Sequence, residues 1–449
     1  MKGGKASIAL SRTLAYMKAR QPDTGASVRD VLVFQLARFG DIVQSKRLLL
    51  SLAAQENTRV HFCVDHSMTA LATMLYPFAE VHGLPAHNSG SRPEAVASGA
   101  YKTFAALREI NFSEVYLLNF SPLSFACASL FQPEILRGYA RVRGQDMRGK
   151  LSLLAFNLMR DRRFAPLNLV DLWAAFHPAP IPPEKVNPIP KAAGSGRIGI
   201  VMAGRDSRRS LPVRELALCV QSIFQARGGP RLICIGSKAE RPLVRRLARE
   251  LPPTIMQNME DLTGKTSLTD LPDALDGLDM LLTPDTGAMH LAAHLGVPVQ
   301  AFFLSSAGCW ETGPYGFGHK IWQALETCSP CRESDPCPTP SACLRPFGHP
   351  AFLAHLAGRW ESDWPEGLLG CVTSLDRLGV TCKTVGGDDP HEPARRELRD
   401  GLFDYLNDGQ PSDQIDASPS FLSQELAEFL FTEKDWMTPD NWRQTPFRG

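Results

Sequence analysis

Short apolar runs alternate with amphipathic stretches along the first half of the chain. The apolar run DVLVFQLA, at 30–37, precedes the amphipathic stretch IVQSKRLLLSLAAQ, and further apolar runs begin at Arg59 (RVHFCVD) and Glu114 (EVYLLNF). Runs of this length are typical of buried strands, and strands that alternate with helices form parallel sheets. We therefore expect an α/β domain, which ends at a Pro-rich and then Gly/Ser-rich segment at 177–196.

The same alternation restarts beyond this segment. Strands are expected in RIGIVMA, RLICIG, DGLDMLLTP and VPVQAFFL, and helices in LPVRELALCVQSIFQARGG, AERPLVRRLARELP and GAMHLAAHLG. After about Gly358 the pattern weakens, and we expect one helix between Leu375 and Gln410 and a second in PSFLSQELAEFLFTEKDW.

The hydrophobic pattern thus predicts an α/β fold with two Rossmann-like domains, whose strand ends face each other across a cleft. Its expected parts are an N-terminal arm (1–28), an N-terminal domain (29–180), a linker (181–196), a C-terminal domain (197–358) and a helical C-terminal extension (359–449).

The composition fits a globular protein, with 44% hydrophobic and 21% charged residues. The net charge of +1 gives no global field that attracts nucleic acid, so no nucleic-acid partner is expected. No apolar run reaches the roughly 18 residues that span a bilayer. The basic N-terminus carries Arg12 within its apolar stretch and no small-residue cleavage site, so we expect a cytoplasmic protein.

The loop after the first strand, ARFGD, carries Gly40 and Asp41. Gly40 permits a close approach of backbone. Asp41 opens the following helix, where it could simply cap the first turn. At the edge of the cleft its carboxylate could also act as a general base.

Two strand-end loops of the second domain are candidates for binding phosphate or ribose. The loop AGRDSRRSLP carries Arg205, Arg208 and Arg209, whose guanidinium forks match phosphate oxygens. In IGSKAE, Glu240 could accept hydrogen bonds from a ribose or base. A first-turn helix acid favoured by the helix dipole is an equal alternative for Glu240.

A third loop places an acid, a hydroxyl, a glycine and a histidine where a strand turns into a helix. In LLTPDTGAMHLAAHLG these residues are Asp285, Thr286, Gly287 and His290. Asp and Thr are ordinary helix caps. The free N–H groups and dipole of the same helix end also attract phosphate, so we expect an anion site with built-in capping.

Four of the eleven cysteines cluster in CSPCRESDPCPTPSACLR, within 328–343. Core packing does not explain them, because the stretch has almost no other apolar residues. In a reducing cytoplasm four thiolates suit a structural zinc ion; free or disulfide-forming thiols and an iron–sulfur cluster are the alternatives. We expect the segment to brace the preceding TGPYG loop, 312–316. The four residues are Cys328, Cys331, Cys337 and Cys343.

Together these stretches make the sequence resemble glycosyltransferase family 9, the heptosyltransferases of lipopolysaccharide core assembly. The match is carried by VLVFQLARFGDIVQSKRLLLSL, the arginine loop, DLTGKTSLTDLPDALDGLDMLLTPDTGAMHLAAHLGVPVQAFF, TGPYG and the cysteine cluster. The resemblance implies a GT-B fold and an inverting transfer, without a metal in catalysis, from a nucleotide-diphosphate sugar. The absence of any D-x-D motif fits a mechanism that relies on arginines instead of a divalent ion.

Carried over residue by residue, the resemblance makes Asp41 the catalytic base. Arg209 stands where the family has a lysine that contacts donor phosphate, and Glu240 is the expected ribose contact. Asp285, Thr286, Gly287 and His290 match the donor motif.

In this family the N-terminal domain holds the acceptor, often an anionic glycolipid. Arg137, Arg141 and Arg143 of the basic segment 135–150 are acceptor candidates, or else parts of a solvated surface loop. Leu10, Leu14 and Met17 of the N-terminal arm have helical spacing, which suits either peripheral contact with the inner face of the cytoplasmic membrane or packing on the domain.

The expected activity is transfer of a heptose or similar sugar, from an ADP-linked donor, to a lipopolysaccharide-core or other cell-surface glycan acceptor. The alternatives are a nucleotide-sugar-binding protein without turnover and a sugar epimerase on the same fold. This choice rests on family analogy.

Overall fold

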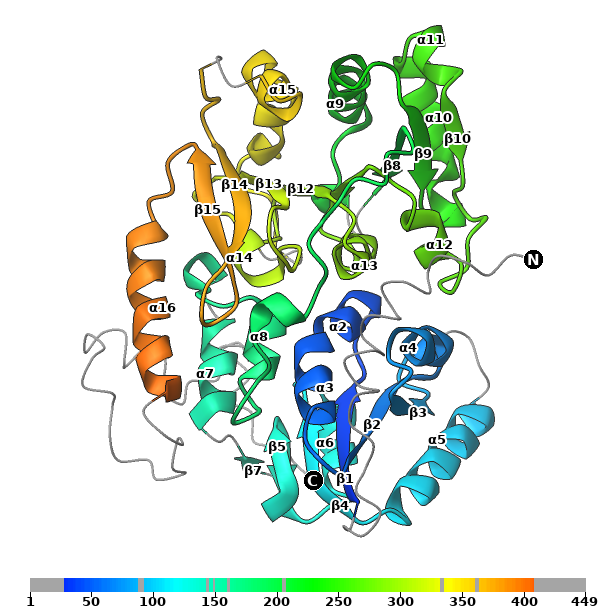
Figure 1. Ribbon diagram of the computed structural model, residues 1–449, viewed down its shortest axis with the longest axis vertical. Coiled ribbons are helices and arrows are strands. Elements are labelled where there is room, and N and C mark those ends of the chain that lie inside the picture. Colours follow the sequence, from blue (N-terminus) through cyan, green and yellow to red (C-terminus); the bar gives the residue numbers. More distant parts are fainter. Residues whose placement is uncertain are drawn as a thin grey trace.

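A computed structural model describes residues 28–87, 93–142, 145–147, 150–159, 162–203, 207–331, 335–359 and 363–407. Nearly all of the N-terminal arm and the second helix expected in the C-terminal extension lie outside these residues. The described chain forms two α/β lobes, one above the other in Figure 1. No described helix has both the length and the apolar character needed to cross a membrane.

The N-terminal lobe is built on a five-stranded parallel sheet with the order β3-β2-β1-β4-β5. Its strands are β1 (Arg29–Gln35), β2 (Thr58–Asp65), β3 (Ala79–Leu84), β4 (Phe112–Leu117) and β5 (Leu136–Gly138). Its helices are α2 (Phe39–Gln44), α3 (Lys46–Ala53), α4 (Thr69–Leu75), α5 (Pro93–Arg108), α6 (Pro122–Ala128), α7 (Lys150–Leu158) and α8 (Leu169–Ala174). The basic segment at 135–150 forms β5 and a short hairpin, β6 (Ala140–Val142) with β7 (Gln145–Met147).

The C-terminal lobe contains an eight-stranded sheet with the order β10-β9-β8-β11-β12-β13-β14-β15. Its strands are β8 (Arg197–Val201), β9 (Arg231–Ile235), β10 (Met259–Asp261), β11 (Met280–Pro284), β12 (Val299–Phe303), β13 (Lys320–Ala324), β14 (Leu368–Leu375) and β15 (Val380–Gly386). Its helices are α9 (Val213–Ala226), α10 (Arg241–Glu250), α11 (Pro253–Met256), α12 (Leu271–Leu275), α13 (Gly287–Leu295), α14 (Cys309–Thr312) and α15 (Pro350–Leu356). The α/β fold with two Rossmann-like sheets is as predicted.

The segment after Gly358 differs from the expectation of helices alone. β14 pairs antiparallel with β13 and then with β15, so this segment completes the C-terminal sheet. The helix expected between Leu375 and Gln410 is α16 (Glu392–Asn407). In Figure 1 it runs beside α7 and α8 of the first lobe, and Arg399 donates a hydrogen bond to the carbonyl of Pro166.

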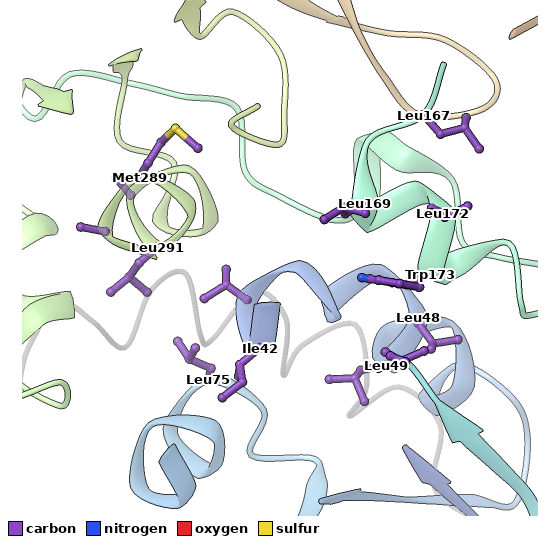
Figure 2. Close-up of a cluster of buried hydrophobic side chains, with 14 of the residues drawn as sticks. Ile42, Leu48, Leu49, Leu75, Leu167, Leu169, Leu172, Trp173, Met289 and Leu291 are labelled. Carbon is purple, nitrogen blue, oxygen red and sulfur yellow. The ribbon is translucent and has the colours of Figure 1, made fainter. Parts of the chain in front are cut away.

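One apolar core continues from the first lobe into the second. Figure 2 shows Ile42 of α2 and Leu75 of α4 beneath Leu291 of α13, and all three side chains are buried in the same cluster. Because this cluster includes residues of both sheets, the facing lobes are held by apolar packing as well as by the linker.

A buried polar network also joins the lobes. Arg47 of α3 pairs with Asp171 of α8, with 2.6 Å between Nη1 and Oδ1, and also donates to the carbonyl of Leu378. The hydroxyl of Tyr315 donates to the same carboxylate at 2.6 Å, and the backbone N–H of Val380 donates at 2.8 Å. The carboxylate of Asp171 therefore connects both lobes with the β14–β15 turn.

Candidate active site

The strand-end turns that carry the predicted base and donor motif lie against each other. α2 packs against α13, and glycines permit the contact. A Cβ at Gly40 would lie 3.1 Å from Cδ2 of His290, and a Cβ at Gly287 would overlap the ring of Phe39. Neither glycine has a positive φ, so their role is the close approach of the two turns.

Asp41 lies in the first turn of α2 at the boundary between the lobes. Its Oδ2 accepts a hydrogen bond of 3.0 Å from the backbone N–H of Arg38, which is the capping role considered for it. Burial raises the pKa of Asp41 above its ordinary value, and the nearby Asp285 carboxylate adds to the shift, although Arg38 opposes it. A carboxylate of raised pKa accepts a proton more readily, so capping and base catalysis are compatible here.

Asp285 organises the donor-side residues. Its carboxylate pairs with the Arg209 guanidinium, and Nη2 of Arg209 also lies 3.1 Å from the Asp285 carbonyl. The hydroxyl of Thr312 donates to Oδ2 of Asp285 at 3.2 Å, and Nε2 of His290 lies 3.7 Å from Oδ1. Burial lowers the pKa of His290 and Arg209 acts in the same direction, while Asp285 opposes them.

Thr286 is the N-cap of α13. Its hydroxyl accepts a 3.3 Å hydrogen bond from the N–H of Met289 and lies 3.0 Å from the hydroxyl of Thr283. The capping expected from the sequence is therefore present. Asp285, Arg209 and the N-terminus of α13 together place a cation and a helix end beside Asp41.

The other predicted donor contacts interact with other parts of the chain or lie outside the described residues. Glu240 accepts a hydrogen bond from the N–H of Ser237 and forms a capping box over a short turn, the alternative considered for it. Arg208 donates to the carbonyl of Asp335 in the cysteine segment at 2.9 Å. Arg205 lies outside the described residues.

The acceptor candidates interact locally in the described structure. Nη2 of Arg137 lies 3.4 Å from the carboxylate of Glu114. The guanidinium of Arg141 lies 4.6 Å from the centre of the Phe125 ring. Arg143 is not among the described residues.

All four clustered cysteines line one small pocket together with Arg208 and Ser305. The N–H of Cys331 donates to the carbonyl of Ser305 at 2.8 Å, so this segment braces the loop after β12. Thr312 of TGPYG is held instead by Asp285 and by the Gly308 carbonyl. Among the described residues, the four sulfurs do not form a set of three ligand atoms within 4.8 Å of one another.

One residue near the site that was not predicted from the sequence is Lys46, which lies in a second pocket between the lobes. Its Nζ donates to Oδ1 of Asn187 in the linker at 2.9 Å, and His290 and Tyr315 line the same pocket. Burial lowers the pKa of Lys46 to about 7. The only signal was its place five residues after Asp41, on a helix that otherwise looks amphipathic.

Residues 220–339 match the model of glycosyltransferase family 9 (heptosyltransferase). Among solved structures, a family 9 glycosyltransferase from Veillonella parvula aligns with a TM-score of 0.54 and 15% identity, covering 68% of this chain and 89% of that chain. The ADP-heptose lipopolysaccharide heptosyltransferase II of E. coli aligns with a TM-score of 0.50 and 18% identity, covering 74% and 100%. A comparison with curated proteins finds no match.

At these identities the structural likeness establishes the fold, and the two facing Rossmann-like sheets define a GT-B-type protein. The match to the family 9 model covers residues 220–339, within the C-terminal lobe. Over these residues the match agrees with the resemblance drawn from the motifs.

Proposed function

We propose that the protein transfers a heptose or similar sugar from an ADP-linked donor to a lipopolysaccharide-core or other cell-surface glycan. The proposed donor is that of the structurally similar E. coli enzyme, an ADP-heptose heptosyltransferase. The observation that carries the proposal is the packing of the Asp41 turn on the donor motif, with Gly40 against His290 and Gly287 against Phe39. This contact puts the Asp41 carboxylate next to the N-terminus of α13, whose free N–H groups and dipole favour anions.

On the donor side, Arg209 and the N-terminus of α13 are the groups proposed to hold the diphosphate. Negative charge builds on the leaving phosphate as the bond to the sugar breaks, and fixed donors that face it lower the barrier. The carboxylate of Asp285 pairs with Arg209 and therefore fixes the guanidinium in place. Arg205 and Glu240 stay proposed contacts to phosphate and ribose.

On the acceptor side, Asp41 is proposed as the general base. It takes the proton from an acceptor hydroxyl, whose oxygen forms the new bond to the anomeric carbon while the bond from that carbon to the diphosphate breaks. The displacement is a single step and inverts the anomeric configuration. In this mechanism Arg209 and the helix end supply the positive charge, so the transfer needs no metal.

The acceptor is proposed to bind the N-terminal domain through Arg137, Arg141 and Arg143. Arginine forks suit anionic groups such as those of a glycolipid core. Such an acceptor would place the enzyme in the cytoplasm, at the inner face of the membrane. If activity on an anionic glycolipid survives replacement of both Arg141 and Arg143 by Ala, this acceptor site is wrong.

For the cysteine cluster we propose a structural zinc ion outside the chemistry. The shared pocket of Cys328, Cys331, Cys337 and Cys343 supports it, although the sulfurs would have to draw together to ligand distance. Elemental analysis of protein purified without added metal tests the idea. Less than about 0.2 zinc or iron per chain, with reactive thiols, leaves free cysteines, since a structural site binds close to one ion.

The decisive experiment uses Asp41→Ala with donor and acceptor supplied. We expect kcat to fall by about 10²- to 10⁴-fold, the usual contribution of a positioned base, with nucleotide affinity nearly unchanged. The kcat of the wild type should fall as the pH is lowered, because only the ionised form of Asp41 accepts a proton. The midpoint of this fall should lie above about pH 4, since burial raises the pKa of Asp41. Asp273→Asn, an exposed first-turn acid of α12, is the matched control.

The same assay separates the alternatives. A binding protein releases no nucleoside diphosphate from any donor, and an epimerase changes the sugar while the nucleotide sugar stays intact. Full activity of Asp41→Ala would remove Asp41 from the mechanism.

A further inference from the structure

A second group of potential metal ligands lies in the N-terminal sheet, away from the transfer site. His61 of β2 is in register with Glu80 of β3, and His82 follows two positions along β3. Side chains two apart on a strand share a face, so all three lie on the same face of the sheet. Among the described residues, this set alone brings three ligand atoms within 4.8 Å of one another.

The three ligand atoms have the spacing of one small coordination sphere. Nδ1 of His61 lies 3.0 Å from Nε2 of His82 and 3.7 Å from a carboxylate oxygen of Glu80. The other Glu80 oxygen lies 4.0 Å from Nε2 of His82. Around a tetrahedral zinc ion, nitrogen and oxygen ligands are separated by about 3.3 Å.

The carboxylate of Asp30 fixes the orientation of the His61 ring. Oδ1 of Asp30, at the start of β1, lies 2.9 Å from Nε2 of His61 and accepts a hydrogen bond from that nitrogen. The lone pair of Nδ1 is then turned toward His82 and Glu80. A carboxylate that accepts from the far nitrogen is the usual outer partner of a metal-bound histidine.

The surroundings hold this geometry and leave one side open. Arg59 donates to both oxygens of Asp30, at 2.5 and 3.1 Å, and compensates its charge. The ring of His61 is stacked on His82 and meets Phe112 edge-on. The His61 side chain is buried at 2% exposure, whereas that of Glu80 is 55% exposed, so an ion could enter from solvent on the Glu80 side.

We propose that His61, Glu80 and His82 form a site for a divalent transition-metal ion, with zinc as the best match, and with solvent completing the coordination. Without an ion, a proton from Nε2 of His82 bridges to Nδ1 of His61, and the ion takes the place of that proton. Two imidazoles and one carboxylate are ligands that Zn²⁺ accepts readily. The site holds the edge strand β3 to β2 and has no part in the transfer.

The test is metal binding by the full-length protein after it has been stripped with a chelator. Cobalt(II) serves as the spectroscopic probe, because thiolate ligands give intense charge-transfer bands and a site of two histidines and a carboxylate gives only weaker d–d bands. We expect the double variant Cys328→Ser/Cys331→Ser, in which the cysteine cluster cannot supply four thiolates, to bind about one cobalt ion that lacks thiolate bands and that zinc displaces. Zinc should also raise the melting temperature.

Three variants and one control decide the assignment. His82→Gln should abolish this binding, Glu80→Gln should weaken it, and Asp30→Asn should weaken it by about 10- to 100-fold. His66→Gln, an exposed histidine just after β2, should bind as wild type does. Glu80 is exposed, so Glu80→Gln remains informative even if a change at His82 disturbs folding. If the Cys328→Ser/Cys331→Ser protein binds no cobalt, or if its binding is unaffected by Glu80→Gln and His82→Gln, the proposal is overturned.

Discussion

At the scale of single residues, Lys46 places a titratable cation in the pocket between the lobes. Its ammonium donates to Asn187, and His294 is near enough for Lys46 to help burial lower the pKa of that histidine. His290 and Tyr315 face the same pocket. Burial lowers the pKa of Lys46 from 10.5 to about 7, so folding disfavours the charged form of this side chain.

Stability should therefore depend on pH at this residue. Between pH 7 and about 10 the unfolded chain holds the Lys46 proton and the folded chain does not, so this contribution to stability rises with pH. Below pH 7 both states are protonated and the full penalty applies. The free energy of unfolding of Lys46→Met, relative to that of the wild type, should be highest at pH 7. This difference should fall by up to about 1.4 kcal/mol per pH unit as the pH rises.

Urea unfolding of both proteins from pH 7 to about 10 measures the difference. Loss of the hydrogen bond to Asn187 shifts the difference in free energy of unfolding by about 1–3 kcal/mol at every pH. It does not alter how steeply that difference changes with pH. Lys185→Met, a nearby lysine of the linker whose exposed side chain precedes Asn187, is the control. A pH-independent difference for Lys46→Met would contradict the prediction.

At the scale of elements, the meeting of α2 and α13 depends on the absence of two side chains. The sequence suggested Gly40 for close approach, and the structure adds that Gly287 faces the ring of Phe39. Gly40 lies in the first turn of α2, next to Asp41. Gly287 begins α13 directly after the N-cap residue Thr286. Packing between these helices therefore controls the distance between Asp41, the proposed base, and the donor motif.

Gly287→Ala should widen this contact. The added Cβ overlaps the Phe39 ring, and such overpacking costs about 1–3 kcal/mol in the free energy of unfolding. Transfer should fall more than donor affinity does, because the base moves away from the bound sugar. Phe39→Ala in the same chain should restore part of the activity.

Gly99→Ala serves as the control for this change. A Cβ at Gly99, within α5, meets only ordinary contacts at 3.7 Å, and alanine favours the helix. If Gly287→Ala and Gly99→Ala have equal effects on the free energy of unfolding and on transfer activity, the close approach of α2 and α13 does not matter.

Elements with clear apolar runs could be predicted from the sequence, and those shaped by distant contacts could not. β1, β8, β11 and α13 follow directly from the hydrophobic pattern. β14 and β15 were missed because glycine is a poor strand former. In the folded chain the ring of Trp364 packs on both Gly370 and Gly386 and stacks on Trp322. A side chain at either glycine would overlap this ring.

The same limit applies to the site residues. Asp41 and Asp285 could be paired because the carboxyl ends of parallel strands meet at one edge of each sheet. Lys46 carries only its place near Asp41 as a sequence signal, and His61 carries none, because their partners, Asn187 and His82, are fixed by the linker path and by strand register. For Glu240, the sequence left two roles open, and the described structure contains the capping one.

At the scale of the whole molecule, the lobes share an apolar core and the Asp171 network. The Arg47–Asp171 pair is almost fully buried, with exposed fractions of 4% and 1%. Tyr315 and Val380 donate to the same carboxylate, so both lobes and the β14–β15 turn depend on it. Removing one partner of such a pair leaves a buried charge without compensation.

Asp171→Ala should therefore lower the free energy of unfolding by about 3–5 kcal/mol. The matched control is Glu392→Gln, which breaks an exposed pair with Arg396 on α16 and should change stability by less than about 0.5 kcal/mol. Urea unfolding with separate probes in each lobe is the measurement. If Asp171→Ala unfolds like the control, the network does not hold the lobes together.

The Asp171 network also sets an order of events while the chain is being made. Val380, which donates to Asp171, lies 209 positions later in the chain. At roughly 5–20 residues per second, a ribosome needs about 10–40 s to add that stretch. Through this interval the emerging N-terminal half carries Asp171 and part of its apolar face without their later partners. We therefore expect the newly made N-terminal lobe to depend on chaperones until the β14–β15 turn has been synthesised.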